Sequence, residues 1–209
     1  RCLVVTTALA CLVGLPLVCF GGWEMVLVGA ACVLFCFLYT TLLAQHGMGD
    51  VLVLLFFGLV PVCLTYYVIL PPASQTITAQ VVWASLACGL VIDTLLVVNN
   101  YRDYDQDRAV GKKTLIVRIG RERAEQLYGW LGNIATYMMW GCLVLGDSSF
   151  VLMLVCFACF VPYALLHGAT RVQMRRIGRG RELNKVLGMT ARNMFVFGVT
   201  TAIVTLFIL

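Results

Sequence analysis

Charged side chains are scarce in this sequence. Asp, Glu, Lys and Arg together make up 12% of its 209 residues, and only ten residues are acidic. Soluble domains carry about 25% charged residues, whereas 61% of this chain is hydrophobic and its mean hydropathy is +0.94. This composition excludes a soluble domain and a disordered chain. It predicts one all-α domain over residues 1–209, a polytopic bundle of transmembrane helices in the lipid bilayer.

A disulfide or zinc framework is also lacking, although the chain has ten cysteines. All of them lie inside apolar runs, which predicts small hydrophobic side chains buried in the bundle. Cys156 and Cys159 form a C-x-x-C pair, but no basic neighbour and no further zinc ligand accompanies it. We therefore expect the cysteines to be structural.

Long apolar runs predict seven membrane spans, because about 20 apolar residues cross the hydrocarbon core as a helix. Glycine and proline pairs such as Gly21-Gly22 and Pro71-Pro72 separate some of the runs. Pro16, Pro61 and Pro162 fall inside spans, where neighbouring helices can satisfy the freed carbonyls. The expected spans are residues 2–20, 24–43, 50–70, 79–100, 124–145, 150–169 and 190–209.

The basic residues are confined to two expected long loops and the first residue. Residues 101–123 and 170–192, together with Arg1, hold all fifteen Lys and Arg residues. If seven spans alternate in direction, these segments share one face, which the positive-inside rule makes cytoplasmic. We therefore predict a multi-pass inner-membrane protein. For the second loop, topology and contact with anionic lipid explain the cations sufficiently.

Three of the ten acidic residues stand within five positions after the fourth span, at Asp103, Asp105 and Asp107. If the helix continues, Asp103 and Asp107 are one turn apart on one face, with Asn99 a further turn back. Two stacked carboxylates repel each other unless a cation separates them. Mg²⁺ takes oxygen ligands and is often held by one or two carboxylates plus substrate phosphates. The spacing predicts a magnesium site formed by Asp103 and Asp107.

The residues that follow are donors suited to phosphate oxygens. Lys112, Lys113, Thr114 and Arg118 lie directly after the carboxylates. Carboxylates, metal and cations together indicate a phosphate or diphosphate ligand. The alternative is a helix end whose Asp and Arg side chains form ordinary surface pairs.

Two further acids lie inside or at the edge of expected spans. Asp50 opens the third span on the same face as Asp103, and it either stabilises the positive end of that helix or belongs to the site. Asp93 lies deeper in the fourth span, where a lone carboxylate is costly unless it is protonated or paired. Its partner cannot be named from the pattern.

Residues 99–120 have the form N-N-x-R-D-x-x-x-D-x-x-x-G-K-x-T-L-x-V-R-x-G. This stretch resembles the second aspartate-rich motif of the UbiA family of intramembrane prenyltransferases. His46-Gly47-Met48-Gly49-Asp50 and the following Phe56-Phe57-Gly58 resemble the branch of the family that acts on 1,4-dihydroxy-2-naphthoate. The similarity extends over nearly the whole chain.

The resemblance implies an enzyme that transfers a polyprenyl group from a polyprenyl diphosphate to 1,4-dihydroxy-2-naphthoate, giving demethylmenaquinone. Asp103 and Asp107 would hold Mg²⁺ toward the cytoplasm, and Asp50 would lie by the aromatic acceptor or the metal. The remaining side chains implied in substrate binding are His46, Asn99, Arg102, Lys112 and Arg118.

The family has nine spans and an earlier N-x-x-x-D-x-x-x-D motif, and this chain shows neither. We therefore expect it to lack the first two helices and half of the metal site, and to be inactive by itself. Two alternatives remain open: another aromatic acceptor such as 4-hydroxybenzoate, or a non-catalytic seven-span protein such as a transporter. No nucleic acid is expected as a partner.

Overall fold

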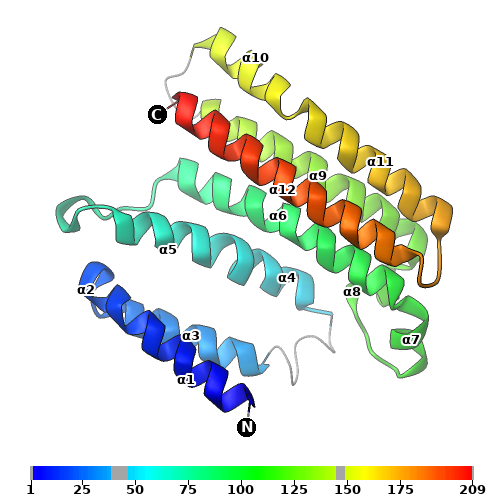
Figure 1. Cartoon of the computed structure of the whole chain (residues 1–209), viewed down its shortest axis with the longest axis horizontal. Helices are drawn as coiled ribbons and strands as arrows, with labels where there is room; N and C mark the ends of the chain where they lie inside the picture. Colours follow the sequence, from blue (N-terminus) through cyan, green and yellow to red (C-terminus); the bar gives the residue numbers. More distant parts are fainter. Residues whose placement is uncertain (1, 39–46, 145–148, 209) are drawn as a thin grey trace.

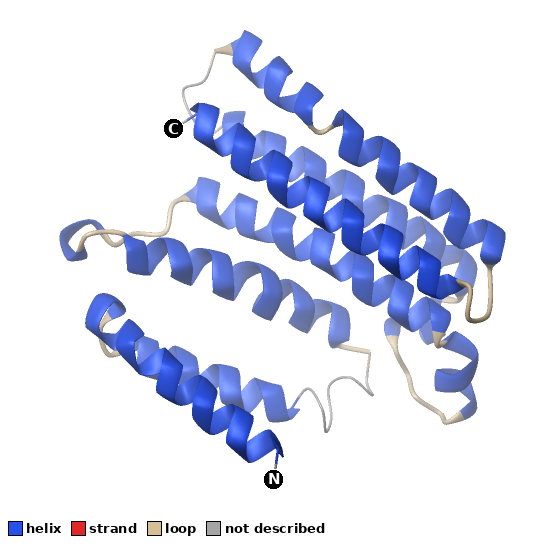
Figure 2. Cartoon of the chain, in the orientation of Figure 1, coloured by secondary structure: helices blue, strands red, loops and turns tan. Residues whose placement is uncertain are grey.

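The computed structural model describes residues 2–38, 47–144 and 149–208. Within these ranges every regular element is helical and there is no strand (Figure 2). The helices form one long rod for each predicted span, and the rods lie side by side (Figure 1). This confirms the predicted all-α, polytopic bundle.

The first two rods form a layer of their own at one side of the bundle (Figure 1). They comprise α1 (Cys2–Gly14), η1 (Leu15–Leu17) and α2 (Val18–Gly21), followed by α3 (Glu24–Leu38). A hydrogen bond from the Gln75 side chain to the Phe20 carbonyl (2.8 Å) ties this layer to the loop before α6. Most of its apolar side chains are exposed, as expected for helices in contact with lipid.

The third rod runs antiparallel to α6 (Ala79–Arg102) and approaches it closely. It consists of α4 (Gly49–Val53), the π-helical segment η3 (Leu54–Leu59) and α5 (Val60–Ile69). A Cβ atom placed on Gly58 would lie 2.7 Å from the Cα of Gly89 on α6. Glycine at both positions therefore permits the backbones to touch. The short helix η4 (Pro72–Ser74) lies in the connection between α5 and α6.

The core lies where α6 packs against α9 (Arg121–Val144) and α12 (Leu183–Ile208), which in turn pack against α11 (Val161–Ile177). One buried cluster surrounds Phe160, Tyr163 and Phe197, and the other surrounds Tyr101 and Tyr128. Aromatic and aliphatic side chains thus hold α6 rigidly in the centre of the bundle.

Each proline inside a rod coincides with a change in helix geometry. Pro16 lies in the 3₁₀ segment η1, and Pro61 is in the first turn of α5, directly after the π-helical η3. Pro162 is in the first turn of α11, after α10 (Phe150–Cys159). Proline lacks an N–H and fixes φ, so a new helix starts favourably there.

The two expected long basic loops are largely helical, which corrects the sequence prediction. Residues 101–123 contain the end of α6, the short helices α7 (Tyr104–Ala109) and α8 (Leu115–Ile119), and the start of α9. In the second segment α11 continues to Ile177 and α12 already begins at Leu183. Hydropathy marks where a helix leaves lipid, whereas backbone hydrogen bonding continues into the polar region.

Five rods are long and apolar enough to cross a membrane, so a multi-pass protein is confirmed. Over the described residues the remaining two do not meet these limits of length and composition. The described part of α3 is shorter, and α9 carries Arg121, Glu122, Arg123 and Glu125 in its first turns. Seven crossings therefore stay a prediction. The five candidate spans are Val4–Gly21, Gly49–Ile69, Ala79–Arg102, Phe150–Ile177 and Leu183–Leu206.

The cysteines form no disulfide among the described residues, as expected. Their predicted burial is wrong for four of them, since Cys11, Cys19, Cys36 and Cys159 are exposed, whereas Cys63 and Cys156 are buried. A small apolar side chain suits a lipid-facing helix surface as well as a core.

Candidate functional site

A large apolar cavity of about 900 Å³ lies between α3, α4, η3, α6 and α12. Phe35 and Phe56 meet at its wall with their ring centroids 5.1 Å apart. Asn99, which begins the aspartate-rich segment, supplies the single side-chain amide among the described lining residues. The lining residues are Cys32, Phe35, Cys36, Leu52, Val53, Phe56, Phe57, Ile92, Leu95, Leu96, Asn99, Leu187, Gly188 and Ala191.

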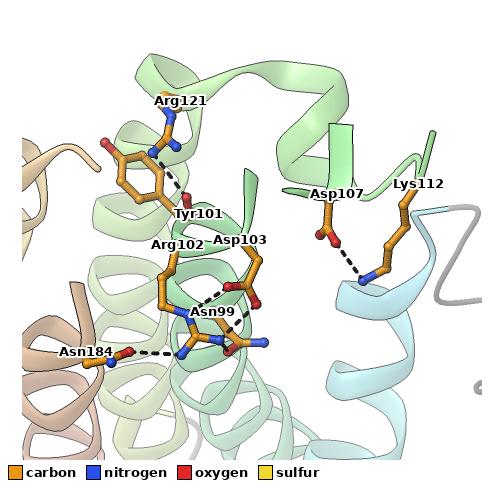
Figure 3. A network of polar contacts seen from close by, with 8 residues as sticks. All are labelled: Asn99, Tyr101, Arg102, Asp103, Asp107, Lys112, Arg121 and Asn184. Atoms are coloured by element: carbon orange, nitrogen blue, oxygen red, sulfur yellow. Dashed lines mark hydrogen bonds and ion pairs between the residues drawn. The ribbon is translucent and has the colours of Figure 1, made fainter. Parts of the chain in front are cut away.

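The Asn99 end of the cavity is joined to a network around Arg102 (Figure 3). The Arg102 guanidinium donates to both oxygens of Asp103, at 2.8 and 2.9 Å, and to the Asn99 side-chain oxygen at 2.9 Å. It also donates to Asn184 on α12 at 3.1 Å. The hydrogen bond from Arg102 holds the pKa of the Asp103 carboxyl below its ordinary value, since it favours the ionised form. Asn99 and Asp103 therefore share one cation.

Asp107 belongs to a second, separate group (Figure 3). The Lys112 ammonium donates to Asp107 Oδ1 at 3.2 Å, while Asp107 Oδ2 is buried and has no hydrogen-bond partner in the described part of the chain. Lys112 reaches back because the chain turns at Gly111, whose φ is +75°. Thr114 then caps α8 by accepting a hydrogen bond from the Val117 amide. This turn places the lysine beside the carboxylate.

The predicted stack of Asp103 and Asp107 on one continuous helix is wrong. Helix α6 ends at Arg102, and Asp103 stands at the junction with φ −88° and ψ 4°. A backbone hydrogen bond from the Asp107 amide to the Asp103 carbonyl (2.9 Å) does cross the junction. The side chains nevertheless face different cations, because the bend separates their directions (Figure 3).

Asp50 lies in the first turn of α4 and is buried, with 9% relative exposure. Neither of its carboxylate oxygens has a hydrogen-bond partner among the described residues. A small cavity of about 30 Å³ adjoins it and is also lined by Asn100, Lys112 and Thr114. The structure thus brings Asp50 to the lysine that contacts Asp107.

Asp93 on α6 is 5% exposed, and its Oδ1 atom is buried without a partner. Leu54 reaches Gly89 across the antiparallel helices, and Asp50 and Asp93 each lie one turn from that contact, so the two acids stand at the same level of the interface. The acid whose partner the pattern could not supply thus lies beside another acid.

Of the other two predicted substrate-binding residues, Arg118 is described by the structure and His46 is not. The Arg118 guanidinium donates to the Lys113 carbonyl at 3.2 Å, at the same end of the bundle. His46 lies outside the described residues, and its expected part in substrate binding stays a prediction.

Arg121 is a structural anchor that the sequence pattern did not single out. Its guanidinium donates to the carbonyls of Tyr101 (3.1 Å) and Gly178 (2.6 Å) and to the Asp105 carboxylate (3.0 Å). It also lies 4.8 Å from the ring centroids of Tyr101 and Tyr104. These contacts join the aspartate-rich segment to the turn between α11 and α12. Its i+16 separation from Asp105 leaves no local signal of this role.

The carboxylates suit a divalent cation, although no group of three or more His, Cys, Asp and Glu side chains occurs in the part of the chain that is described. Buried carboxylate oxygens without partners remain on Asp50 and Asp107. Mg²⁺ commonly takes one or two carboxylates and completes its shell with water and substrate phosphate. The donor set thus fits Mg²⁺, and its binding by Asp103 and Asp107 stays a prediction.

Comparison with known proteins places the chain among prenyltransferases. The sequence profile of the UbiA prenyltransferase family matches residues 1–187. Three similar proteins are described as 1,4-dihydroxy-2-naphthoate octaprenyltransferase. That of Escherichia coli (strain K12) is 31% identical over 174 residues, covering 79% of this chain and 49% of that protein. That of Mycobacterium tuberculosis is 34% identical over 204 residues, covering 93% and 64%.

The third, from Mycobacterium leprae, is 32% identical over 209 residues, covering 95% of this chain and 65% of that protein. The chain thus spans between about half and two thirds of the length of these relatives. No solved structure matches significantly.

Proposed function

Because the chain belongs to the UbiA prenyltransferase family, we propose that the whole protein transfers a polyprenyl group from a polyprenyl diphosphate to 1,4-dihydroxy-2-naphthoate. The acceptor is that of the relatives with which the chain shares 31–34% identity. We place the protein in the inner membrane as a multi-pass protein with this site toward the cytoplasm, where the positive-inside rule puts its basic end.

One observation carries the proposal: the large apolar cavity ends at Asn99, beside the carboxylates and cations of the aspartate-rich segment. A prenyl diphosphate has a long apolar chain attached to a compact, highly charged head. Leu52, Phe56 and the other apolar lining residues suit the chain. Lys112 suits the head, and it lines a small cavity that shares Leu96 with the large one.

The proposed reaction breaks the bond between the prenyl C1 atom and the diphosphate oxygen, and the electron pair leaves with the diphosphate. A ring carbon of the naphthoate forms the new C–C bond, and loss of its carboxylate as CO₂ restores the aromatic ring. The product is the quinol form of demethylmenaquinone. Mg²⁺ held by Asp103 and Asp107 would supply positive charge to the leaving diphosphate.

The residues of this chain contribute in three ways. Asp103 and Asp107 would hold the metal, and Lys112 and Arg118 supply positive charge that stabilises the departing diphosphate. The hydrogen bond from Arg102 fixes the orientation of the Asn99 side chain, which lines the end of the cavity. The apolar cavity wall excludes water, which would otherwise capture the allylic cation.

The proposal is tested by supplying the full-length protein, in membranes, with Mg²⁺, a long-chain prenyl diphosphate and dihydroxynaphthoate. We expect a prenylated product by mass spectrometry and a loss of at least about 100-fold in Asp103→Ala and in Asp107→Asn. Asp105→Asn is the matched control, because this carboxylate is 60% exposed and pairs with Arg121. Absence of product, or full activity of Asp103→Ala, contradicts the proposal.

The acceptor is tested separately by competition. Dihydroxynaphthoate and 4-hydroxybenzoate are offered together at equal concentration, and the ratio of products gives the ratio of kcat/KM values. Predominant prenylation of 4-hydroxybenzoate would keep the prenyl transfer and overturn the choice of acceptor.

A further inference from the structure

Asp50 and Asp93 lie between two helices held at close distance by glycine. Gly58 contacts Gly89 where the third rod crosses α6, and the Leu54 side chain also reaches Gly89. Asp50 precedes Leu54 by one helical turn, and Asp93 follows Gly89 by one turn on the antiparallel partner. The same close interface therefore buries both carboxylates.

Two adjacent buried carboxylates cannot both be ionised at low cost, because each loses hydration and they repel each other. The arrangement of lowest free energy has one proton shared by the pair, so that one neutral acid donates a hydrogen bond to one carboxylate. Asp93 lies deeper in the span, while Asp50 adjoins the small cavity with Lys112. The negative charge is stabilised most at Asp50, beside the lysine.

The cavity next to Asp50 has room for a water molecule. Its volume is about 30 Å³, and Asp50, Asn100, Thr114 and Lys112 offer the polar partners that a buried water needs. The Lys112 ammonium already donates to Asp107 on its other side. Asp50 thus supplies a second anionic contact, through water, to the same ammonium.

We propose that Asp93 and Asp50 act together as positioning residues for Lys112, holding its ammonium between Asp50 and Asp107 in the small cavity, which shares Leu96 with the large apolar cavity. This rests on the proposed function for its consequence, since Lys112 is the cation offered to the diphosphate. Asp93 acts by donating a hydrogen bond to Asp50, so an amide at position 93 can replace it and an alkyl side chain cannot.

A direct test observes Lys112 and does not depend on the reaction. Reductive methylation with ¹³C-formaldehyde labels the lysines of the detergent-solubilised protein, and the signal lost in Lys112→Arg identifies Lys112. We expect Asp50→Asn and Asp93→Leu to move the Lys112 resonance toward that of Lys113 at fixed pH. Asp93→Asn leaves it in place, and Asp105→Asn, which removes an exposed carboxylate of the same segment, does so too.

Two results overturn the proposal. One is a Lys112 resonance that stays in place in Asp50→Asn, or that moves together with the resonances of Lys113 and Lys185. The other is an equal change in Asp93→Asn and Asp93→Leu. Should Asp93→Leu fail to fold, Asp93→Ala takes its place in the comparison with Asp93→Asn, because it also removes the hydrogen-bonding group.

The kinetic consequence is measured in the full-length protein. Asp50→Asn raises the KM for prenyl diphosphate roughly tenfold, equivalent to about 1.4 kcal/mol, with a smaller effect on the KM for the acceptor. An unchanged KM for prenyl diphosphate contradicts the role in diphosphate binding. Failure of the prenyl-transfer reaction itself leaves the resonance test intact, so the two proposals fail separately.

Discussion

Arg102 binds the carboxylate of its neighbour Asp103 through two hydrogen bonds of 2.8 and 2.9 Å. The same guanidinium holds Asn99 one turn back on α6 and Asn184 on α12. The planar Arg102 guanidinium, a fork of N–H donors, therefore connects the end of α6, the aspartate-rich segment and the start of α12. Lysine, with one ammonium on a flexible stem, cannot reproduce this geometry.

Replacing Arg102 by lysine keeps the charge and removes the fork. We expect a loss of about 0.5–1 kcal/mol, because the side chains of Arg102 and Asp103 are 29% and 31% exposed and solvent screens the pair. The measurement is thermal unfolding in detergent. Lys185→Arg is the control, since its pair with Glu182 is about two thirds exposed and no change in Tm is expected. Equal shifts in both variants contradict the role of the fork.

The crossing at Gly58 predicts a steric penalty. In Gly58→Ala the new methyl group meets backbone atoms of Gly89 and Ser85 at 2.7 Å, so the helices must separate. We expect a loss of about 1–3 kcal/mol, measured as a lower Tm. Gly198→Ala on α12 meets no atom within 4 Å and gains up to about 1 kcal/mol from helix propensity. A tolerated alanine at Gly58 would disprove the close contact.

The apolar cavity predicts a change in prenyl preference. Gly188 lines the cavity, and a Cβ atom there meets nothing within 4 Å. Gly188→Leu therefore folds but fills part of the chamber, and kcat/KM shifts toward shorter prenyl diphosphates by roughly tenfold. Gly198→Leu, on the same helix but not among the cavity residues, keeps the original preference. The check is a competition between a short and a long prenyl diphosphate, and an unchanged ratio counts against the chamber.

We expect substitution of Arg121 to lower the stability of the fold more than substitution of Arg102 does, because the Arg121 side chain is only 15% exposed. Arg121→Lys gives up at least one of the contacts to Gly178, Asp105 and the tyrosine rings, and leaves a carbonyl without its donor. We expect a loss of about 2–3 kcal/mol in thermal unfolding. Arg123→Lys, on the exposed face of the same helix, is the matched control. Similar Tm values for the two variants contradict the anchor.

The position of the helices was predictable from hydropathy. The fourth span was expected over residues 79–100 and is observed at Ala79–Arg102. The ends of the helices outside the membrane were not predictable from hydropathy. Helix α11 continues through Arg175 and Arg176 because its backbone hydrogen bonds do not depend on lipid, and it stops only at Gly178, whose φ is +64°. Hydropathy shows which part of a helix lies in lipid, whereas a capping residue such as Gly178 shows where the helix ends.

The site was predictable in its residues but not in their pairing. The i,i+4 spacing of Asp103 and Asp107 assumed one continuous helix, whereas the chain bends at Asp103 and gives each carboxylate its own cation. The proximity of Asp50 to Asp93 depends on the register between two antiparallel helices. That register is fixed by the Gly58–Gly89 contact, which no local pattern contains.

The sequence by itself determined that this is a helical membrane protein with a charged, aspartate-rich segment at one end. Composition and residue spacing are sufficient for that, because the membrane as solvent admits few alternatives. The tertiary structure decided which side chains meet. It separated Asp103 from Asp107, brought Asp50 and Lys112 to one small cavity, and placed the apolar cavity at Asn99. Such contacts depend on how helices distant in sequence pack, and packing depends on backbone approach and register in three dimensions.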